Sequence, residues 1–233
     1  MRSIDIVAII PARKGSKRLP NKNSLPLAGK PLIQWTLDAV KDLDVIDMVV
    51  VTSDDESIID LSIKAGVQVV TRPASLSDDF ATSIDVVLHV LEVLKKKEIR
   101  PKRVLFLQPT SPLRRSKHIL AAIKLMDETK VSGVVSVCEL AHPVQWCSKL
   151  GSDLVMSGFI REDDVNKRSQ DFERYYRING AIYLTDVTVI EENKLFFDKD
   201  AKAYVMAEEE SADIDTALDF KWCEFLISET HEK

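Results

Sequence analysis

Short apolar segments alternate along the chain with segments in which apolar residues recur every three or four positions. The apolar segments are rich in β-branched residues and predict strands at residues 4–10, 48–52, 67–70, 104–107 and 134–137. The segments between them have the period of amphipathic helices, at residues 32–40, 58–65, 84–94 and 119–126. This alternation predicts an α/β fold with a mainly parallel sheet flanked by helices. In such folds ligands bind beyond the carboxyl ends of the strands.

Residues typical of helix ends flank the second predicted helix, at residues 58–65. Ser53 stands three residues before Glu56, which is capping-box spacing, so Ser53 is expected to cap the helix. Gly66 stands where a helix of this length should end.

The alternation stops after residue 137. Residues 139–177 mix polar and aromatic residues without a clean period, and the pattern then resumes with expected strands at 180–184 and near 204–206 and a helix at 216–227. A chain of 233 residues is about 1.5 times a typical domain of roughly 150 residues. We therefore expect one domain over residues 1–233, with residues 139–177 as an inserted arm that pairs two subunits. A plain surface excursion is the alternative.

Composition excludes several classes of protein. Apolar residues make up 45% of the chain and charged residues 30%, which is typical of a folded globular protein. The formal net charge of -5 argues against a nucleic-acid partner. No apolar run reaches the roughly 18 residues of a membrane span, so no membrane association is expected. Three cysteines without a C-x-x-C pair favour neither a disulfide framework nor a zinc site, and predict a reducing, cytoplasmic location.

The average charge conceals a basic segment. Residues 1–30 hold seven basic side chains and one acidic one, a net of +6, so the other residues together carry -11. Most of these cations lie in residues 11–23, directly after the first predicted strand, around Gly15 and Ser16. Such a loop offers backbone N–H groups and fixed cations to a triphosphate. It matches neither G-x-G-x-x-G nor G-x-x-x-x-G-K-[ST], and a solvated basic loop is the alternative.

Several motifs carry a family resemblance. The basic loop and residues 27–33 (LAGKPLI) resemble the opening of the sugar nucleotidyltransferases, and the Lys22-Asn23 ending resembles the acylneuraminate cytidylyltransferases, or CMP-sialic acid synthetases. The resemblance continues, in the family's order, through Arg72-Pro-Ala, residues 108–114 (QPTSPLR), residues 179–183 (NGAIY) and residues 213–216 (DIDT). It implies a Rossmann-like nucleotidyltransferase fold and a homodimer. It also implies a reaction in which the anomeric hydroxyl of sialic acid attacks the α-phosphorus of CTP and releases pyrophosphate.

The resemblance assigns residues to the nucleotide. Phosphoryl transfer needs positioning and charge neutralisation more than covalent chemistry, so the basic loop suits the triphosphate, with Lys22 at the α-phosphate. Arg72 and Ser83 are implied near the cytidine, although Arg72 could be a surface or capping arginine and Ser83 a helix cap. The expected nucleotide-binding residues are Arg13, Gly15, Ser16, Lys17, Lys22, Asn23, Arg72 and Ser83, and the expected catalytic residues are Lys22, Arg13 and Asp215.

A second set of residues is assigned by resemblance to the sugar acid. Gln108, Thr110 and Ser111 follow the fourth strand directly, and Asn179 begins a later strand. Arg168 and Gln170 lie on the predicted arm, from which an arginine reaches the partner subunit's substrate in the family. Phe196 and Phe197 suit an N-acyl group.

Asp213 and Asp215 are the expected metal ligands. Two carboxylates beside a phosphate-binding loop would repel the substrate unless a cation lay between them, so we expect Mg²⁺, with Mn²⁺ as the alternative. Asp215 could instead cap the terminal helix, a role open also to Thr216. The acidic run Glu208–Glu210 is expected to be a solvated surface.

Three alternatives of substrate remain: legionaminic, pseudaminic and 3-deoxy-manno-octulosonic acid. A non-catalytic anion-binding module is the alternative from a different class, but such a module gains nothing from two carboxylates at its site. No general base stands out among the motifs.

Overall fold

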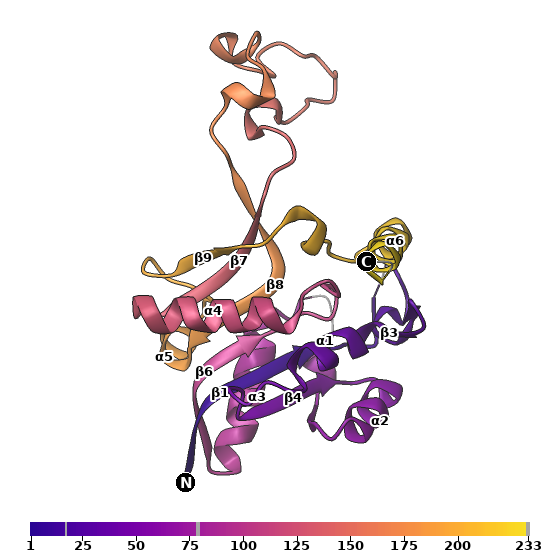
Figure 1. Cartoon of the computed structure of the whole chain (residues 1–233), viewed down its shortest axis with the longest axis vertical. Helices are drawn as coiled ribbons and strands as arrows, with labels where there is room; N and C mark the ends of the chain where they lie inside the picture. The colour runs from indigo at the N-terminus through magenta and orange to yellow at the C-terminus, as the bar shows by residue number, and fades with distance from the viewer. Residues whose placement is uncertain (17, 78–79, 232–233) are drawn as a thin grey trace.

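A mixed seven-stranded sheet forms the centre of the computed structural model, which describes residues 1–16, 18–77 and 80–231 (Figure 1). Its order is β5-β4-β1-β6-β8-β7-β9. β8 runs antiparallel to both of its neighbours, whereas the other adjacent strands pair in parallel, which confirms the mainly parallel sheet. The strands are β1 (Arg2–Pro11), β4 (Met48–Ser53), β5 (Gln68–Thr71), β6 (Ile99–Phe106), β7 (Gly133–Glu139), β8 (Tyr176–Asp186) and β9 (Lys202–Val205).

Helices cover both faces of this sheet. Alternate residues of β1 explain why its sequence is continuously apolar: Ile6 and Ile10 join the core on one face, and Val7 and Ile9 join the core on the other. The first face packs against α1 (Leu32–Val40), α2 (Glu56–Lys64) and α4 (Ser116–Thr129). The second packs against α3 (Ser83–Lys96) and α5 (Val187–Asn193). The terminal helix α6 (Ala217–His231) packs with Leu27 and Ile214 in a smaller third cluster.

Every predicted strand and helix is present: α1 has the predicted bounds, and the ends of the others are shifted. β6 begins at Ile99, five residues before the predicted segment, because its first half contains Pro101 and three basic residues that hide the apolar pattern. The hairpin of β2 (Pro26–Leu27) and β3 (Lys30–Pro31) and the short helix α5 were not predicted. Gly66 has φ +75° just beyond α2 and ends it as expected.

The expected cap of α2 was wrong. Asp55, not Ser53, is the N-cap residue, and its carboxylate accepts hydrogen bonds from Ser57 N at 2.9 Å and Ser57 Oγ at 2.7 Å. Ser53 is the last residue of β4, and its hydroxyl donates to the Ala12 carbonyl at 2.6 Å. The sequence alone did not identify the cap residue, because Ser53, Asp54 and Asp55 all precede Glu56 and each can cap a helix.

An arm of residues 140–175 projects from the sheet between β7 and β8 (Figure 1). It contains single turns of 3-10 helix at Val144–Trp146, Glu162–Asp164 and Ser169–Asp171. The carboxylate of Asp164 holds one turn together by accepting from Arg161 at 2.7 Å and Lys167 at 2.8 Å. Many apolar side chains on the arm are exposed, including Leu154 at 70%. Among the described residues, no helix is long and apolar enough to cross a bilayer.

Replacing Asp55 by alanine should remove the α2 cap and lower the free energy of unfolding by about 1 kcal/mol, as measured by urea denaturation. Asp60→Ala makes the same chemical change at an exposed position of the same helix and should change stability by less than about 0.5 kcal/mol. Equal effects of the two substitutions would contradict the assignment of the cap.

Candidate functional site

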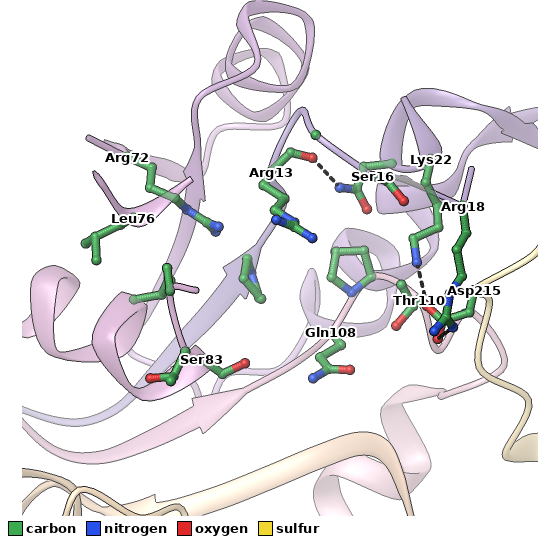
Figure 2. A pocket seen from close by; sticks show the side chains of 17 residues that line it. Arg13, Ser16, Arg18, Lys22, Arg72, Leu76, Ser83, Gln108, Thr110 and Asp215 are labelled. Atoms are coloured by element: carbon green, nitrogen blue, oxygen red, sulfur yellow. Dashed lines mark hydrogen bonds and ion pairs between the residues drawn. The ribbon is translucent and has the colours of Figure 1, made fainter. Parts of the chain in front are cut away.

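A pocket of about 500 Å³ lies at the carboxyl edge of the parallel strands, where the strand pattern places ligands (Figure 2). The basic loop forms one side, the segment from β5 into α3 forms another, and the residues after β6 form the floor. The pocket is lined by Pro11, Arg13, Gly15, Ser16, Arg18, Lys22, Asn23, Arg72, Leu76, Ala81, Thr82, Ser83, Val86, Gln108, Pro109, Thr110 and Asp215.

Backbone and side-chain hydrogen bonds fix the basic loop against the sheet. Ala12 N donates to the Thr52 carbonyl at 3.0 Å, and the Ala12 carbonyl accepts from Ser53 Oγ. Asn23 is buried, and its Nδ2 donates to the Arg13 carbonyl at 3.1 Å, which joins the two ends of the loop. Asn23 therefore shapes the loop as well as lining the pocket.

Four described cations converge on this pocket. Arg13 and Arg72 reach the same hollow from different strands, while Arg18 and Lys22 extend toward Asp215 (Figure 2). Arg72 is 6% exposed, and its Nη2 donates to the Thr52 carbonyl at 3.0 Å, so it is a buried residue rather than a surface arginine. Burial lowers the pKa of Arg72 to about 10, with Asp54 opposing and Arg13 adding to the shift, and leaves the guanidinium charged at neutral pH.

Lys22 connects the basic loop to the carboxyl-terminal segment. Its Nζ donates to the Ile214 carbonyl at 2.6 Å and lies 3.1 Å from an Asp215 oxygen. Arg18 lies 3.1 Å from the other Asp215 oxygen. Arg18 was not among the expected binding residues, because nothing in the loop's sequence distinguishes it from its neighbours.

Thr216 takes the role of helix cap that Asp215 could have filled. Thr216 Oγ1 accepts from Asp219 N at 3.3 Å, and Asp219 accepts in return from Thr216 N at 2.7 Å. The Asp215 carboxylate is consequently left to the pocket.

Asp213 lies on the same segment in a more buried setting. Burial raises the pKa of its carboxyl, the neighbouring Asp215 charge adds to the shift, and Thr110 and Lys22 oppose it. Among the described residues its buried Oδ1 has no hydrogen-bond partner.

The two carboxylates have the chemistry of a divalent-cation site. Mg²⁺ is usually held by one or two carboxylates together with substrate phosphates, and an unpartnered carboxylate oxygen is a suitable ligand. Within the described residues, no cluster of three or more histidine, cysteine or acidic side chains could hold a metal by itself. The donor set of Asp213 and Asp215 therefore fits a cation that arrives with a phosphate ligand.

The residues expected at the nucleotide are almost all in the pocket. Gly15 and Ser16 line it beside the cations, and Ser83 lines it from the start of α3. Thr82, not Ser83, caps α3, through a capping box with Asp85. Lys17 lies outside the described residues.

The residues expected at the sugar are less concentrated. Gln108 and Thr110 line the pocket, and Ser111 is buried beneath them with a hydroxyl that has no partner among the described residues. Asn179 is 2% exposed and does not line the pocket: its Oδ1 accepts from Ser136 Oγ at 2.6 Å, and its Nδ2 donates to Ser211 Oγ at 2.9 Å. Asn179 thus ties β7 and β8 to the segment that leads to Asp213.

The other four residues expected at the sugar do not line this pocket. Arg168 and Gln170 are exposed on the arm. Phe196 is partly buried and packs against the core, with its ring centroid 4.8 Å from Phe106 and 4.9 Å from Tyr183, and Phe197 is exposed.

Two residues that sequence reasoning missed organise this edge of the sheet. Arg114 is completely buried, and Glu210, expected to be solvated, is largely buried and pairs with Lys117 at 2.6 Å and His118 at 3.0 Å. The solvated reading of Glu208–Glu210 was therefore wrong for Glu210, whose partners on α4 are far away in the sequence.

The chain is similar in sequence to known cytidylyltransferases. A family model described as cytidylyltransferase matches residues 7–209. The N-acylneuraminate cytidylyltransferase of Escherichia coli O18:K1:H7 is 36% identical over 93% of the chain and 50% of its own length, so the chain spans about half of that relative. The CMP-N,N'-diacetyllegionaminic acid synthase of Legionella pneumophila is 36% identical over 97% of the chain and 98% of its own length.

A solved structure supports the fold. CMP:2-keto-3-deoxy-manno-octonic acid synthetase complexed with CTP superposes with a TM-score of 0.69 at 20% identity, covering 97% of this chain and 99% of that one.

Replacing Asp213 by asparagine should raise the free energy of unfolding at pH 7. Burial raises the pKa of this carboxyl in the folded state above its ordinary 3.8, so at a pH above that ordinary value the aspartate side chain lowers the free energy of unfolding. The gain should shrink as the pH falls and disappear below the ordinary pKa of 3.8, where the carboxyl is protonated in both the folded and the unfolded chain. Urea denaturation between pH 7 and about pH 3 measures it.

Asp215→Asn is the matched control, because the Asp215 carboxylate is exposed and paired with Lys22 and Arg18. It should give no gain. A stabilisation by Asp213→Asn that persisted at acidic pH would contradict the explanation by charge burial.

Proposed function

Because the chain belongs to the cytidylyltransferase family, we propose that it transfers CMP from CTP to the anomeric hydroxyl of N-acetylneuraminic acid, giving CMP-sialic acid and pyrophosphate. The observation that carries this proposal is the pocket that Arg13, Arg18, Lys22 and Arg72 line together with Asp215. Four cations and a carboxylate within one hollow suit a triphosphate and its cation better than they suit an uncharged ligand.

The proposed binding of CTP divides the pocket in two. The triphosphate lies along the basic loop, where Gly15 and Ser16 offer N–H groups and Arg13 and Lys22 offer charge. The cytidine lies toward Arg72 and Ser83, which line the other end. A base pocket that hydrogen-bonds its ligand discriminates strongly, because a wrong base leaves buried polar groups unpaired.

The proposed reaction is an in-line displacement. The anomeric oxygen forms a bond to the α-phosphorus and its proton passes to water, while the bond from the α-phosphorus to the bridging oxygen breaks and pyrophosphate leaves with the electrons of that bond. Lys22 is held by Ile214 and Asp215 at the junction of the two segments, where it can neutralise the charge that builds on the α-phosphate. Arg13, which also lies on the basic loop and lines the pocket, supplies further positive charge to the phosphates.

Asp213 and Asp215 are proposed to hold Mg²⁺, or alternatively Mn²⁺, together with phosphate oxygens. Such a cation neutralises phosphate charge and orients the triphosphate. On binding, it would replace the pairing that Asp215 makes with Lys22 and Arg18, and both basic side chains would become available to phosphate oxygens.

A second sugar acid has its own support. The similarity to the Legionella relative covers nearly the whole of both chains, and that relative is named as a synthase of CMP-N,N'-diacetyllegionaminic acid. Legionaminic acid is therefore the first alternative, followed by pseudaminic and 3-deoxy-manno-octulosonic acid. A non-catalytic anion-binding module is disfavoured, because the carboxylates of Asp213 and Asp215 would repel a bound anion.

Pyrophosphate release decides among these functions. The purified chain, with CTP and Mg²⁺, is offered each of the four sugar acids in turn, and we expect the largest kcat/KM with N-acetylneuraminic acid. A larger value with another sugar acid would replace the substrate, and no release with any of them would remove the enzymatic function.

Lys22→Ala is expected to lower kcat/KM by about 10²- to 10³-fold, because one positioned charge at the reacting phosphate is lost. Lys124→Ala, on an exposed face of α4, is the control and should retain full activity. Circular dichroism of both variants shows whether the fold is retained.

The arm is proposed to pair two copies of the chain. Exposed apolar side chains gather on it, among them Leu154, Val155 and Met156, and a second copy would remove them from water. Arg168 and Gln170 lie on the same arm, which would carry them toward the partner's substrate. We propose a cytoplasmic location, consistent with the free thiols of Cys138, Cys147 and Cys223, and no nucleic-acid or membrane partner.

Light scattering tests the homodimer. The 26.2 kDa chain should give twice that mass, and the double substitution Leu154→Asp with Val155→Asp should return it to a monomer with reduced turnover of sugar. Leu120→Asp changes an exposed leucine of α4 and should leave the dimer intact. A monomeric wild-type chain would remove this part of the proposal.

A further inference from the structure

Gly180 interrupts β8 beside the pocket. Its φ is +77°, a conformation that L-residues rarely adopt. The register between β7 and β8 shifts at this point, between the pairs Val135–Tyr183 and Val137–Ile178, so Gly180 lies in a β-bulge. Bulges are frequent beside functional sites, where they change the direction of nearby side chains.

The bulge brings the backbone of Gly180 against the side chain of Gln108. A Cβ atom at position 180 would stand 3.1 Å from Gln108 Oε1 and 3.9 Å from Ser111 Oγ. The first distance is too short for an ordinary contact between a methyl group and an oxygen, so one of the two groups would have to move.

The main chain of Gln108 cannot move away easily. Its carbonyl accepts from Ser111 N at 3.3 Å and from the buried Arg114 Nη1 at 3.1 Å. A side chain at position 180 would therefore displace the amide of Gln108 and not its backbone. That amide lines the pocket, and the buried Ser111 hydroxyl beneath it is unpartnered among the described residues.

We propose that Gly180 is a positioning residue for the sugar acid. Because glycine has no side chain, the Gln108 amide can occupy its position on the pocket floor, near the Ser111 hydroxyl. The Gln108 amide presents both a donor and an acceptor to a hydroxyl or N-acyl group of the sugar. This inference rests on the proposed function, because it names what holds one of the residues assigned to the sugar.

The competing explanation is that glycine is needed only for its backbone conformation. The chain contains a matched control in Gly66, which has φ +75° and no atom within 4 Å of its would-be Cβ. Gly66→Ala introduces the same backbone strain as Gly180→Ala without the contact to Gln108. Comparing the two variants separates conformation from contact.

The test measures KM for the sugar acid and for CTP by pyrophosphate release. Gly180→Ala should raise the KM for the sugar acid about tenfold, as expected for a displaced contact, and leave the KM for CTP within about twofold. Gly66→Ala should change neither constant. In a Gln108→Ala background, Gly180→Ala should have no further effect on the sugar KM.

Two outcomes would overturn the inference: a sugar KM that responds equally to Gly180→Ala and Gly66→Ala, or the same increase when Gln108 is already alanine. If Gly180→Ala fails to fold, Gly180→Asn takes its place, because asparagine tolerates positive φ and carries an even larger side chain. It should raise the sugar KM at least as much.

A measurement that does not need turnover distinguishes a failure of the role of Gly180 from a failure of the proposed function. The side-chain amide signals of Gln108 in ¹⁵N NMR spectra should shift in Gly180→Ala and remain in place in Gly66→Ala. A wild-type chain that releases no pyrophosphate with any sugar would overturn the proposed function alone. Unchanged amide signals in Gly180→Ala would overturn the role of Gly180 alone.

Discussion

One buried guanidinium joins the parts of the fold that make the pocket. Arg114 is 1% exposed, and it donates to Thr36 Oγ1 on α1, to the Gln108 carbonyl at 3.1 Å and to the Ala181 carbonyl on β8 at 2.8 Å. Burial lowers its pKa to about 9, so the group stays charged at neutral pH without an acidic partner. A buried cation is costly without hydrogen bonds, so the bonds that the two Nη atoms of Arg114 make fix these three parts of the chain relative to one another.

The floor of the pocket follows from that constraint. With its carbonyl held, Gln108 presents its side chain at the end of β6, and β8 passes close by in a bulge that contains Gly180. The antiparallel direction of β8 matters here, because the chain returns from the arm directly at the ligand edge of the sheet. Asn179 and Ser211 then connect this edge to the segment that carries Asp213 and Asp215.

Electrostatics organise the opposite side of the pocket. In the chain by itself, Asp215 pairs with Lys22 and Arg18 across almost two hundred residues of sequence. These contacts hold the basic loop near the carboxyl-terminal segment, but exposed pairs are weak and can exchange for phosphate or a cation. The half-buried Asp213 behaves differently: burial of its carboxyl makes the ionised form costly to the stability of the chain alone, as is common for binding groups.

The sequence by itself determined the order of the main strands and helices, but not the β2–β3 hairpin or α5. It also determined the basic loop after β1 and the two carboxylates before α6, because each is a local pattern read within about ten residues. The pocket residues of the basic loop and of the segment after β6 were predictable for the same reason. Arg114, the cap at Asp55, the pairing of Glu210 and the contact between Gly180 and Gln108 were decided only by tertiary structure. Arg114 meets Ala181 across 67 positions, and Asp55 competed with Ser53 for one helix end. Such contacts depend on which distant residues the strand order of the sheet brings together. The periodicity of a short segment does not reveal which residues those are.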